Sequence, residues 1–246
     1  MNHDLLIIAG AWIIGAFING LTGMGGTLIA LPLISLFLSS KDVILISLIS
    51  GAMVGLLTLL LYARYIDMKE VLGFWLPALP GIGLGIWTLK VVDITLLELL
   101  LCILIVLHIV VQLVQDWLGT CMAPRACMRY ICGFAAGFFG GAIGINGPIM
   151  AIYASLMCME KNKARGFFAS STATSLISIG IMACNGLITE HVLSSSSWVA
   201  PSAVIGFLCA CPLAKRIRQE TFHVALLILL GFAALSLFIR ILPAFS

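Results

Sequence analysis

Two short stretches of this chain combine glycine, asparagine, threonine and proline inside otherwise apolar sequence. The first is NGLTGMGGTLIALPL, from Asn19 to Leu33, and the second is GGAIGINGPIMAIYA, from Gly140 to Ala154. Glycine allows backbone conformations and a close ligand approach that a side chain would obstruct. A helix that resumes after such a stretch begins with unpaired N–H groups and carries partial positive charge there. Each stretch therefore has the chemistry of a site for a small anion.

We predict that a substrate binds between the two stretches. Backbone N–H groups and neutral hydroxyl and amide donors would hold a small oxyanion without trapping it as an arginine would. The candidate substrate-binding residues are Asn19, Thr22, Gly23, Gly25, Gly26, Thr27, Ser50, Gly144, Asn146, Gly147, Ser171 and Thr172. No cofactor and no metal is expected.

The composition places these stretches in a membrane. Hydrophobic residues make up 62% of the 246 residues and charged residues only 9%, whereas soluble domains have about 45–50% and about 25%. The apolar runs leave only short polar connections, which excludes a separate soluble domain. Non-helical backbone is tolerated at membrane depth only where protein buries it or where it lines a wet cavity. The two breaks therefore predict a cavity.

A constant shift of 121 residues (147 minus 26) relates the two stretches. At this shift the two halves align without an insertion or deletion. The matched pairs are Gly20 and Gly141, Gly23 and Gly144, Gly26 and Gly147, Ser50 and Ser171, Pro80 and Pro201, and Gly85 and Gly206. Such a register is typical of an internal duplication. We predict an all-α integral membrane protein with two repeats, residues 1–121 and 122–246, in one domain. Each repeat would have a broken pair of short half-helices followed by three transmembrane helices.

The positions of lysine and arginine indicate how the repeats are oriented. If each broken pair returns to its own side, Lys41, Lys90 and Arg240 share the amino-terminal side, and the other ten of the 13 cations share the opposite side. Cytoplasmic loops collect Lys and Arg. We therefore expect a multi-pass protein of the cell inner (plasma) membrane, with both termini outside the cytoplasm and the second repeat inverted. Many secondary transporters have inverted repeats with interrupted helices and bind substrate near the midplane.

Other glycines and the acidic residues fit simpler roles. Glycines at close spacing are expected to let helices pack closely, and these are Gly51, Gly55, Gly81, Gly83, Gly85, Gly133 and Gly137. All ten acidic residues lie in connections or within about two turns of a predicted helix end, so no buried acid is placed to couple transport to an ion. His108, in mid-span, is a candidate proton relay, and a histidine that only packs is the alternative.

Three segments resemble the TauE/SafE sulfite-exporter family of membrane permeases. GMGGTLIALPL (Gly23–Leu33) and GINGP (Gly144–Pro148) are similar to the two glycine-rich motifs of that family, and ARGFFASSTATSL (Ala164–Leu176) is similar to the segment after the second motif. The resemblance covers essentially the whole chain. It implies transport of small sulfur-containing anions such as sulfite or organosulfonates.

The chain departs from the family pattern at three places. Thr27 and Asn146 each stand where a motif usually has a glycine, and Tyr153 holds the place that Pro32 has in the first copy. These changes add polar groups to the expected site, so the substrate is expected to differ from that of some relatives.

We therefore expect a membrane transporter, an exporter or a facilitator, and not an enzyme. Its partners would be a small inorganic or organosulfur anion and the lipid bilayer, with no nucleic acid. An uncoupled anion channel remains an alternative. An intramembrane enzyme using Ser170 or Ser171 with His108, or a membrane assembly subunit, is a lesser one. The sequence does not indicate an oligomeric state.

Overall fold

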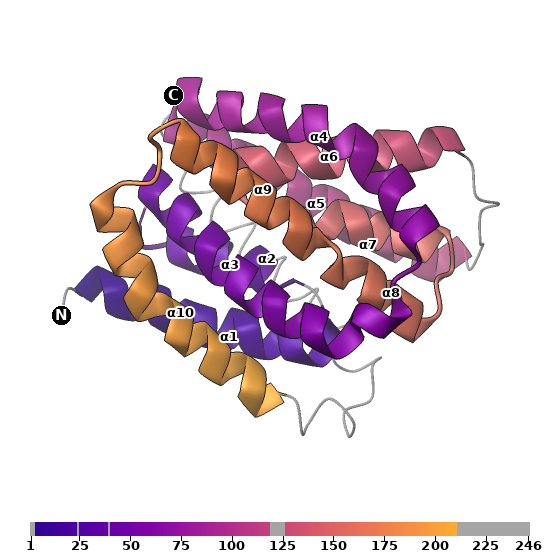
Figure 1. Ribbon diagram of the computed structural model, residues 1–246, viewed down its shortest axis with the longest axis horizontal. Helices are drawn as coiled ribbons and strands as arrows, with labels where there is room; N and C mark the ends of the chain where they lie inside the picture. Colours follow the sequence, from indigo (N-terminus) through magenta and orange to yellow (C-terminus); the bar gives the residue numbers. More distant parts are fainter. Residues whose placement is uncertain (1–2, 24, 39, 119–125, 211–246) are drawn as a thin grey trace.

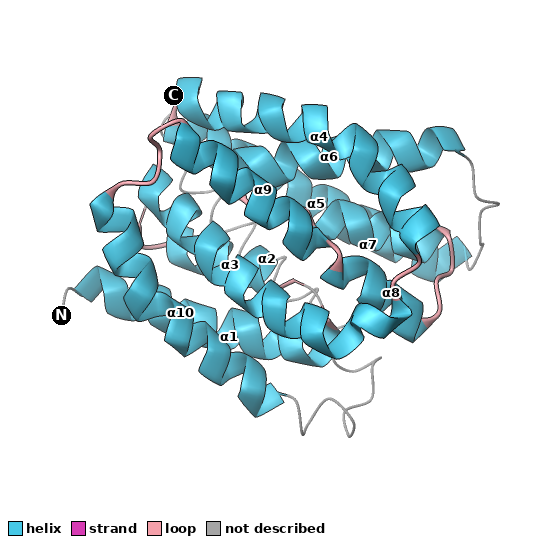
Figure 2. Ribbon diagram, in the orientation of Figure 1, coloured by secondary structure: helices cyan, strands magenta, loops and turns pink. Residues whose placement is uncertain are grey.

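The computed structural model describes residues 3–23, 25–38, 40–118 and 126–210, and its described part consists of helices without a strand (Figure 2). The helices are α1 (His3–Thr22), α2 (Gly26–Ser35), α3 (Lys41–Tyr62), the short 3-10 helix η1 (Ala63–Tyr65), α4 (Met68–Val91), α5 (Ile94–Leu118), α6 (Ala126–Ile143), α7 (Gly147–Leu156), α8 (Lys161–Ala169), α9 (Ser171–Cys184) and α10 (Glu190–Ala210). Within the described residues, six segments are long and apolar enough to cross a membrane. The predicted all-α membrane fold is confirmed.

The helix boundaries repeat at the spacing found in the sequence. Helices α2 and α7 have ten residues each, and both their first and their last residues lie 121 positions apart, at 26 and 147 and at 35 and 156. Helix α3 corresponds to α8 with α9, and α4 corresponds to α10. The boundary expected at 121/122 and the last transmembrane helix expected for the second repeat lie outside the described residues.

The first helix of the broken pair is longer than we predicted. Helix α1 has 20 residues and is among the segments long enough to span a bilayer, so the expectation of two half-helices is wrong. Asn19 and Gly20 remain helical, and the helix ends only where Gly23 adopts a φ of 90°. Of the four described helices in the two broken pairs, only α2 and α7 are half-helices, since ten residues extend about 15 Å, half of a hydrocarbon core of about 30 Å.

One span of the second half is also interrupted. An unbroken transmembrane helix was expected after the second broken pair, but α8 ends at Ala169 and α9 begins at Ser171. The Ser170 hydroxyl donates to the Phe167 carbonyl at 2.6 Å and accepts from Trp75 Nε1 at 2.8 Å. A serine that bonds back to its own helix often bends it, which explains the break.

The two most extensive helix pairs are α4 with α6 and α1 with α10, and each joins the two halves of the chain (Figure 1). Both pairs are parallel. The Ser202 hydroxyl of α10 donates to the Ala9 carbonyl of α1 at 3.2 Å, and Gly206 contacts Ile13 one turn further on. In the other pair, Gly81 contacts Phe134 and Gly85 contacts Phe138.

Helices α3 and α9 are antiparallel. Gly55 of α3 lies against Thr172 of α9, and Tyr62, at the end of α3, lies against Arg165 of α8. In Figure 1, α1 and α3 run from the side of the amino terminus to the far side, whereas α6 and the segment α8–α9 run the other way. Corresponding helices of the two halves therefore run in opposite directions.

Glycines bring α4 and α6 into backbone contact. A Cβ atom on Gly137 would lie 2.8 Å from the Ala78 Cα, and one on Gly81 would lie 2.9 Å from the Phe138 nitrogen. The same crowding surrounds Gly85 and Gly133, so the predicted packing role is confirmed for these four glycines. Gly83 differs, because a Cβ atom there would meet open space.

Candidate substrate cavity

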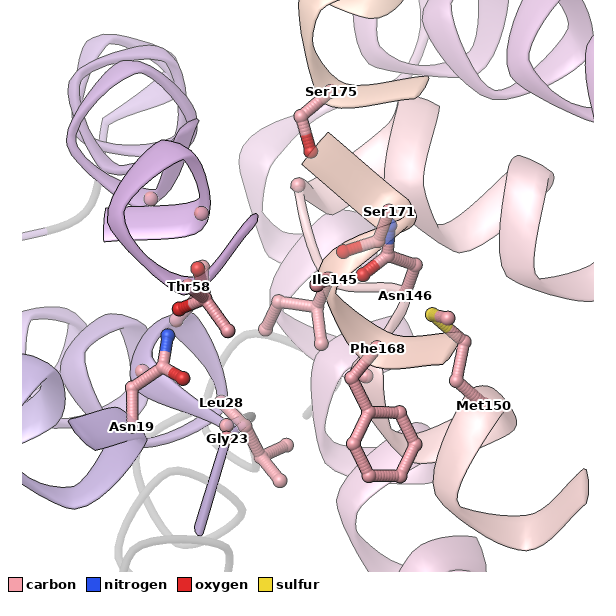
Figure 3. Close-up of a pocket in the computed structure, with 18 of the residues that line it drawn as sticks. Asn19, Gly23, Leu28, Thr58, Ile145, Asn146, Met150, Phe168, Ser171 and Ser175 are labelled. Atoms are coloured by element: carbon pink, nitrogen blue, oxygen red, sulfur yellow. The ribbon is translucent and has the colours of Figure 1, made fainter. Parts of the chain in front are cut away.

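The two breaks face a common cavity with a volume of about 70 Å³ (Figure 3). One water needs about 10–15 Å³ of such space, so the cavity has room for a few waters or one compact ion. Asn19 and Asn146 lie on opposite sides of it, and Ile145 lies between them. The predicted cavity is therefore present where the sequence places the breaks.

Three glycines shape the turns between the helices. Gly23 and Gly25 have φ values of 90° and 93°, and Gly144 has a φ of 73°. Side chains rarely adopt this left-handed region. The turn after α1 therefore needs glycine at two positions, and the turn after α6 needs it at one.

Both half-helices begin at the cavity. The first α-helical bond of α2 runs from the Ile29 N–H to the Gly25 carbonyl, and that of α7 runs from the Met150 N–H to the Asn146 carbonyl, each at 3.2 Å. Earlier N–H groups have no partner inside the helix. Pro148 lies in the first turn of α7, where its missing donor removes no helical bond. The cavity thus receives two positive helix ends.

The cavity brings together nine of the twelve predicted substrate-binding residues. These are Asn19, Gly23, Gly25, Gly26, Thr27, Gly144, Asn146, Gly147 and Ser171. A Cβ atom on Gly147 would meet nothing within 4 Å, and the same is true of Gly25, whose backbone is left-handed. A side chain at Gly147 would therefore extend into free space beside the cavity.

The other three predicted residues do not line the cavity. Thr22 donates its hydroxyl to the Ile18 carbonyl at 2.9 Å. Ser50 is buried in α3, and Thr172 is buried in α9 with its hydroxyl 2.7 Å from the Cβ position of Gly55. These two stand one residue away from cavity-lining Gly51 and Ser171.

Several polar atoms around the cavity are buried without a hydrogen-bond partner among the described residues. They include Asn19 Oδ1, Ser50 Oγ and Thr172 Oγ1. A buried polar atom without a partner costs free energy, so native structures pair most such atoms with protein or water. All three belong to the predicted site, but only Asn19 lines the cavity, whereas Ser50 and Thr172 lie next to lining residues.

Sequence reasoning missed part of the lining. Gly51, Gly55 and Thr58 of α3 face the cavity, although the two glycines were predicted only to pack. They follow one another by four and three residues, so they share one helix face. Ser175 was also missed, and it follows Ser171 by four residues. Helical spacing from the predicted Ser171 could have found Ser175.

A polar cluster ties α7 to its neighbours. The Tyr153 hydroxyl of α7 donates to the Glu70 carboxylate of α4, and Glu70 Oε2 lies 3.5 Å from Arg129 NH1 of α6. The Tyr153 ring also packs against Phe74 and Phe167, with centroid distances of 5.2 Å and 5.7 Å. Tyr153, one of the three residues that depart from the family pattern, therefore fastens the second half-helix.

A second cation fastens the end of α1. Arg165 donates from NH2 to the Leu21 carbonyl at 2.9 Å and from NH1 to the Tyr62 hydroxyl at 3.0 Å. Its guanidinium also lies over the Tyr62 ring, 5.2 Å from the centroid. Arg165 closes the C-terminal end of α1, where carbonyl groups have no helical partners.

Carboxylates and histidines lie away from the cavity in the described part of the chain. His108 is buried in α5 but does not line the cavity. Glu98, in the second turn of the same helix, is also buried, so the expectation of no buried acid is wrong for this residue, but it does not line the cavity either. Across residues 3–210, excluding the undescribed positions, no three His, Cys, Asp or Glu side chains are grouped to hold a metal ion. The chemistry of the cavity is that of N–H groups, amides and hydroxyls.

The fold and the cavity define a polytopic α-helical membrane protein with two helix N-termini directed at one internal polar site. The sequence pattern of the family described as "Sulfite exporter TauE/SafE" matches residues 7–237. This chain therefore belongs to the sulfite exporter TauE/SafE family, a family of membrane transporters, and the resemblance stated above is confirmed. Comparisons with curated proteins and with solved structures give no match.

Proposed function

We propose that the protein transports small sulfur-containing oxyanions, such as sulfite or organosulfonates, and binds them in the cavity between α2 and α7. One observation carries this proposal: two half-helix N-termini, from distant parts of the chain, line the same small cavity. Such ends favour anions. Asn19, Thr27, Asn146 and Ser171 add neutral hydrogen-bonding groups beside them.

The proposal includes the arrangement of the chain in the membrane. Residues 1–121 and 122–246 form two inverted repeats in the inner (plasma) membrane, with both termini outside the cytoplasm. The opposite directions of α3 and α9 support inversion, and the excess of cations on one side supports the orientation.

Cysteine labelling tests this orientation. In a background without the 8 native cysteines, a membrane-impermeant maleimide added to sealed cells should label Asn185→Cys and should not label Arg64→Cys. Both positions are exposed, so the difference reports the side of the membrane. Labelling of Arg64→Cys in intact cells would overturn the orientation.

The charge of the cavity indicates a direction of transport. Two helix ends contribute roughly one elementary positive charge, about +0.5 each, and the neutral donors add none. The membrane potential is worth about 2.3 kcal/mol per charge per 100 mV. A negative cytoplasm would therefore drive a bound anion outward, as in an exporter or an electrogenic facilitator.

Flux into proteoliposomes under an imposed potassium-diffusion potential tests the function. We expect sulfite and a small sulfonate to move faster than chloride or a neutral amino acid, with a rate that follows the potential. A preference for cations or neutral solutes, or a rate indifferent to the potential, would contradict the proposal. Saturation of the flux and stimulation by substrate on the opposite side would separate a carrier from an uncoupled channel, which is the second candidate.

The structure supports a transporter over an intramembrane serine enzyme. A serine nucleophile needs a base within hydrogen-bond reach. The Ser170 hydroxyl instead bonds to Trp75 and to the Phe167 carbonyl. Ser171 faces the cavity, whereas His108 is not part of the lining.

A further inference from the structure

Arg165 lies directly behind the first break. A Cβ atom on Gly23 would be 2.8 Å from Arg165 Cγ and 3.6 Å from Arg165 Cδ, so the arginine side chain packs against a residue that lines the cavity. Phe168 and Ala169 also line the cavity. They follow Arg165 by three and four residues, which places all three on one face of α8.

The charge of Arg165 has no opposite charge beside it. Its hydrogen-bond partners are the Leu21 carbonyl and the Tyr62 hydroxyl, both neutral. Among the described residues, no carboxylate lies within ion-pair distance of Arg165, and its Nε atom is buried without a partner. Arg129 differs only in its charge partner: its Nε atom is also buried without a partner, but its guanidinium pairs with Glu70.

Arg165 is half-buried, and its Nε atom is fully covered by protein. A partly buried cation without a counter-ion is costly and indicates a functional position in a membrane protein. The negative end of the α1 dipole offsets part of the charge, but it leaves Nε unpaired. A compact oxyanion could pair with Nε and with one terminal nitrogen, the bidentate geometry in which guanidinium groups bind oxyanions.

We propose that Arg165 selects anions at the first break, and that an oxyanion entering the cavity supplies the missing counter-ion. The anion would then compete with the Leu21 carbonyl and the Tyr62 hydroxyl for the guanidinium. This inference rests on the proposed function and adds one residue to the binding site. It adds a full positive charge to the preference for anions that the two helix ends provide, whereas the other side-chain donors of the site are neutral.

Sulfite flux in proteoliposomes, measured over a range of concentrations, tests Arg165→Gln, Arg165→Lys and the control Arg64→Gln. Arg64 is an exposed cation that contacts the Tyr65 ring at 4.7 Å, so its replacement removes the same charge away from the cavity. We expect Arg165→Gln to raise the half-saturation concentration about tenfold and to reduce the preference for sulfite over a neutral amino acid. Arg165→Lys should keep the preference, and Arg64→Gln should change neither quantity.

A purely structural role predicts a different result. If Arg165 only holds the end of α1, Arg165→Gln will lower the maximal rate or the amount of folded protein. The half-saturation concentration and the preference for sulfite will then stay unchanged, and this result would show that the inference is wrong. If the unmodified protein moves neither sulfite nor a sulfonate, the proposed function fails first, and the inference fails with it.

A chemical rescue covers the case in which Arg165→Gln does not fold. Arg165→Cys, in the background without native cysteines, is treated with a methanethiosulfonate that adds an aminoethyl group or with one that adds a methyl group. Restoration of sulfite preference by the cationic group alone supports the inference. Equal results with both reagents overturn it.

Discussion

The two breaks have similar backbones but are held in different ways. Each consists of a long helix, a glycine-containing turn and a half-helix of ten residues. In the second break, Tyr153 fastens α7 to Glu70 of the first half. The matching position of α2 is Pro32, which has no side-chain donor. In the first break, Arg165 of the second half fastens the end of α1 instead.

This difference assigns anion attraction and anchoring of the cavity to different breaks, whereas a symmetric site would use both breaks for both. At the second break the carboxylate of Glu70 has both a phenol and a guanidinium beside it, so the charges are balanced and the half-helix is anchored. At the first break the charge of Arg165 is not balanced by a described carboxylate. We therefore expect the first break to attract the anion and the second to fix the geometry of the cavity.

The largest effect is expected from filling the cavity at either half-helix end. Gly147→Leu and Gly26→Leu should each reduce anion flux to background, because a branched side chain would cover an exposed helix end. Gly147→Leu should also leave folding intact, since no neighbour lies within 4 Å of its Cβ position. Flux and the amount of folded protein in the membrane are the measurements.

Gly180→Leu is the matched control, because Gly180 is exposed and also has no neighbour within 4 Å of its Cβ position. Gly51→Ala would be unsuitable, since its Cβ atom would lie 2.9 Å from Thr27 Oγ1 in the cavity wall. Equal flux through the Gly147→Leu and Gly180→Leu proteins would show that the half-helix end does not contact substrate.

The next effect compares the glycines of the two turns. Gly23→Ala and Gly144→Ala should each cost about 1–2 kcal/mol of stability, because both residues have left-handed backbone. Gly23→Ala should cost more stability and should also weaken anion flux. The new Cβ atom would lie 2.8 Å from Arg165 Cγ, so the arginine side chain would have to shift. At Gly144 the nearest atom lies at 3.6 Å. Thermal unfolding in detergent measures the stability of the two variants, and anion flux measures their transport. Equal losses of stability and flux in the two variants would contradict the difference between the two breaks.

Removal of the Tyr153 hydroxyl tests the anchor of α7. Tyr153→Phe keeps the ring contacts with Phe74 and Phe167 and loses only the bond to Glu70. A hydrogen bond to a charged group is worth about 1.5–3 kcal/mol, and partial exposure of Glu70 favours the lower end. We expect a lower unfolding temperature with half-saturation nearly unchanged. A strong change in half-saturation alone would place Tyr153 in the binding site.

The smallest effect is expected at Arg129. Its side chain and that of Glu70 are each 27% exposed, and their closest atoms are 3.5 Å apart. Solvent screens such a pair, so Arg129→Gln should cost about 0.5–1 kcal/mol of stability. The loss should shrink at high salt. Unfolding temperatures at two salt concentrations measure this loss of stability. If Arg129→Gln lost more stability than Tyr153→Phe, the expected order of the two effects would be wrong.

The backbone plan could be predicted from the sequence, whereas the side-chain partners could not. The 121-residue register located both breaks, because Gly23 and Gly144 are local requirements of tight turns. Arg165 gave no such signal, since its role depends on the end of a helix 144 residues earlier in the chain. Tyr153 was noticed as a departure from the family pattern, but its partner Glu70 lies 83 residues away.

Helix length was the main error in the predicted fold. The polar and glycine residues between Asn19 and Thr22 suggested that the first helix stops early, yet they complete α1. Tertiary contacts override weak local propensity, and here Gly20 contacts Phe207 and Ala210 of α10. The second half-helix was found correctly, since Pro148 and Asn146 mark its start.

The pairing of α1 with α10 and of α4 with α6 has a consequence for biosynthesis. Membrane helices insert individually and then associate, and chains emerge from the ribosome amino terminus first. Helix α4 therefore enters the bilayer before α6 exists, with Gly81 and Gly85 still facing lipid. Helix α1 lacks its partner α10 for longer, until residues 190–210 have been translated. We expect a truncated first half to insert but to remain loosely assembled and accessible to membrane proteases, and co-expression of the second half to protect it.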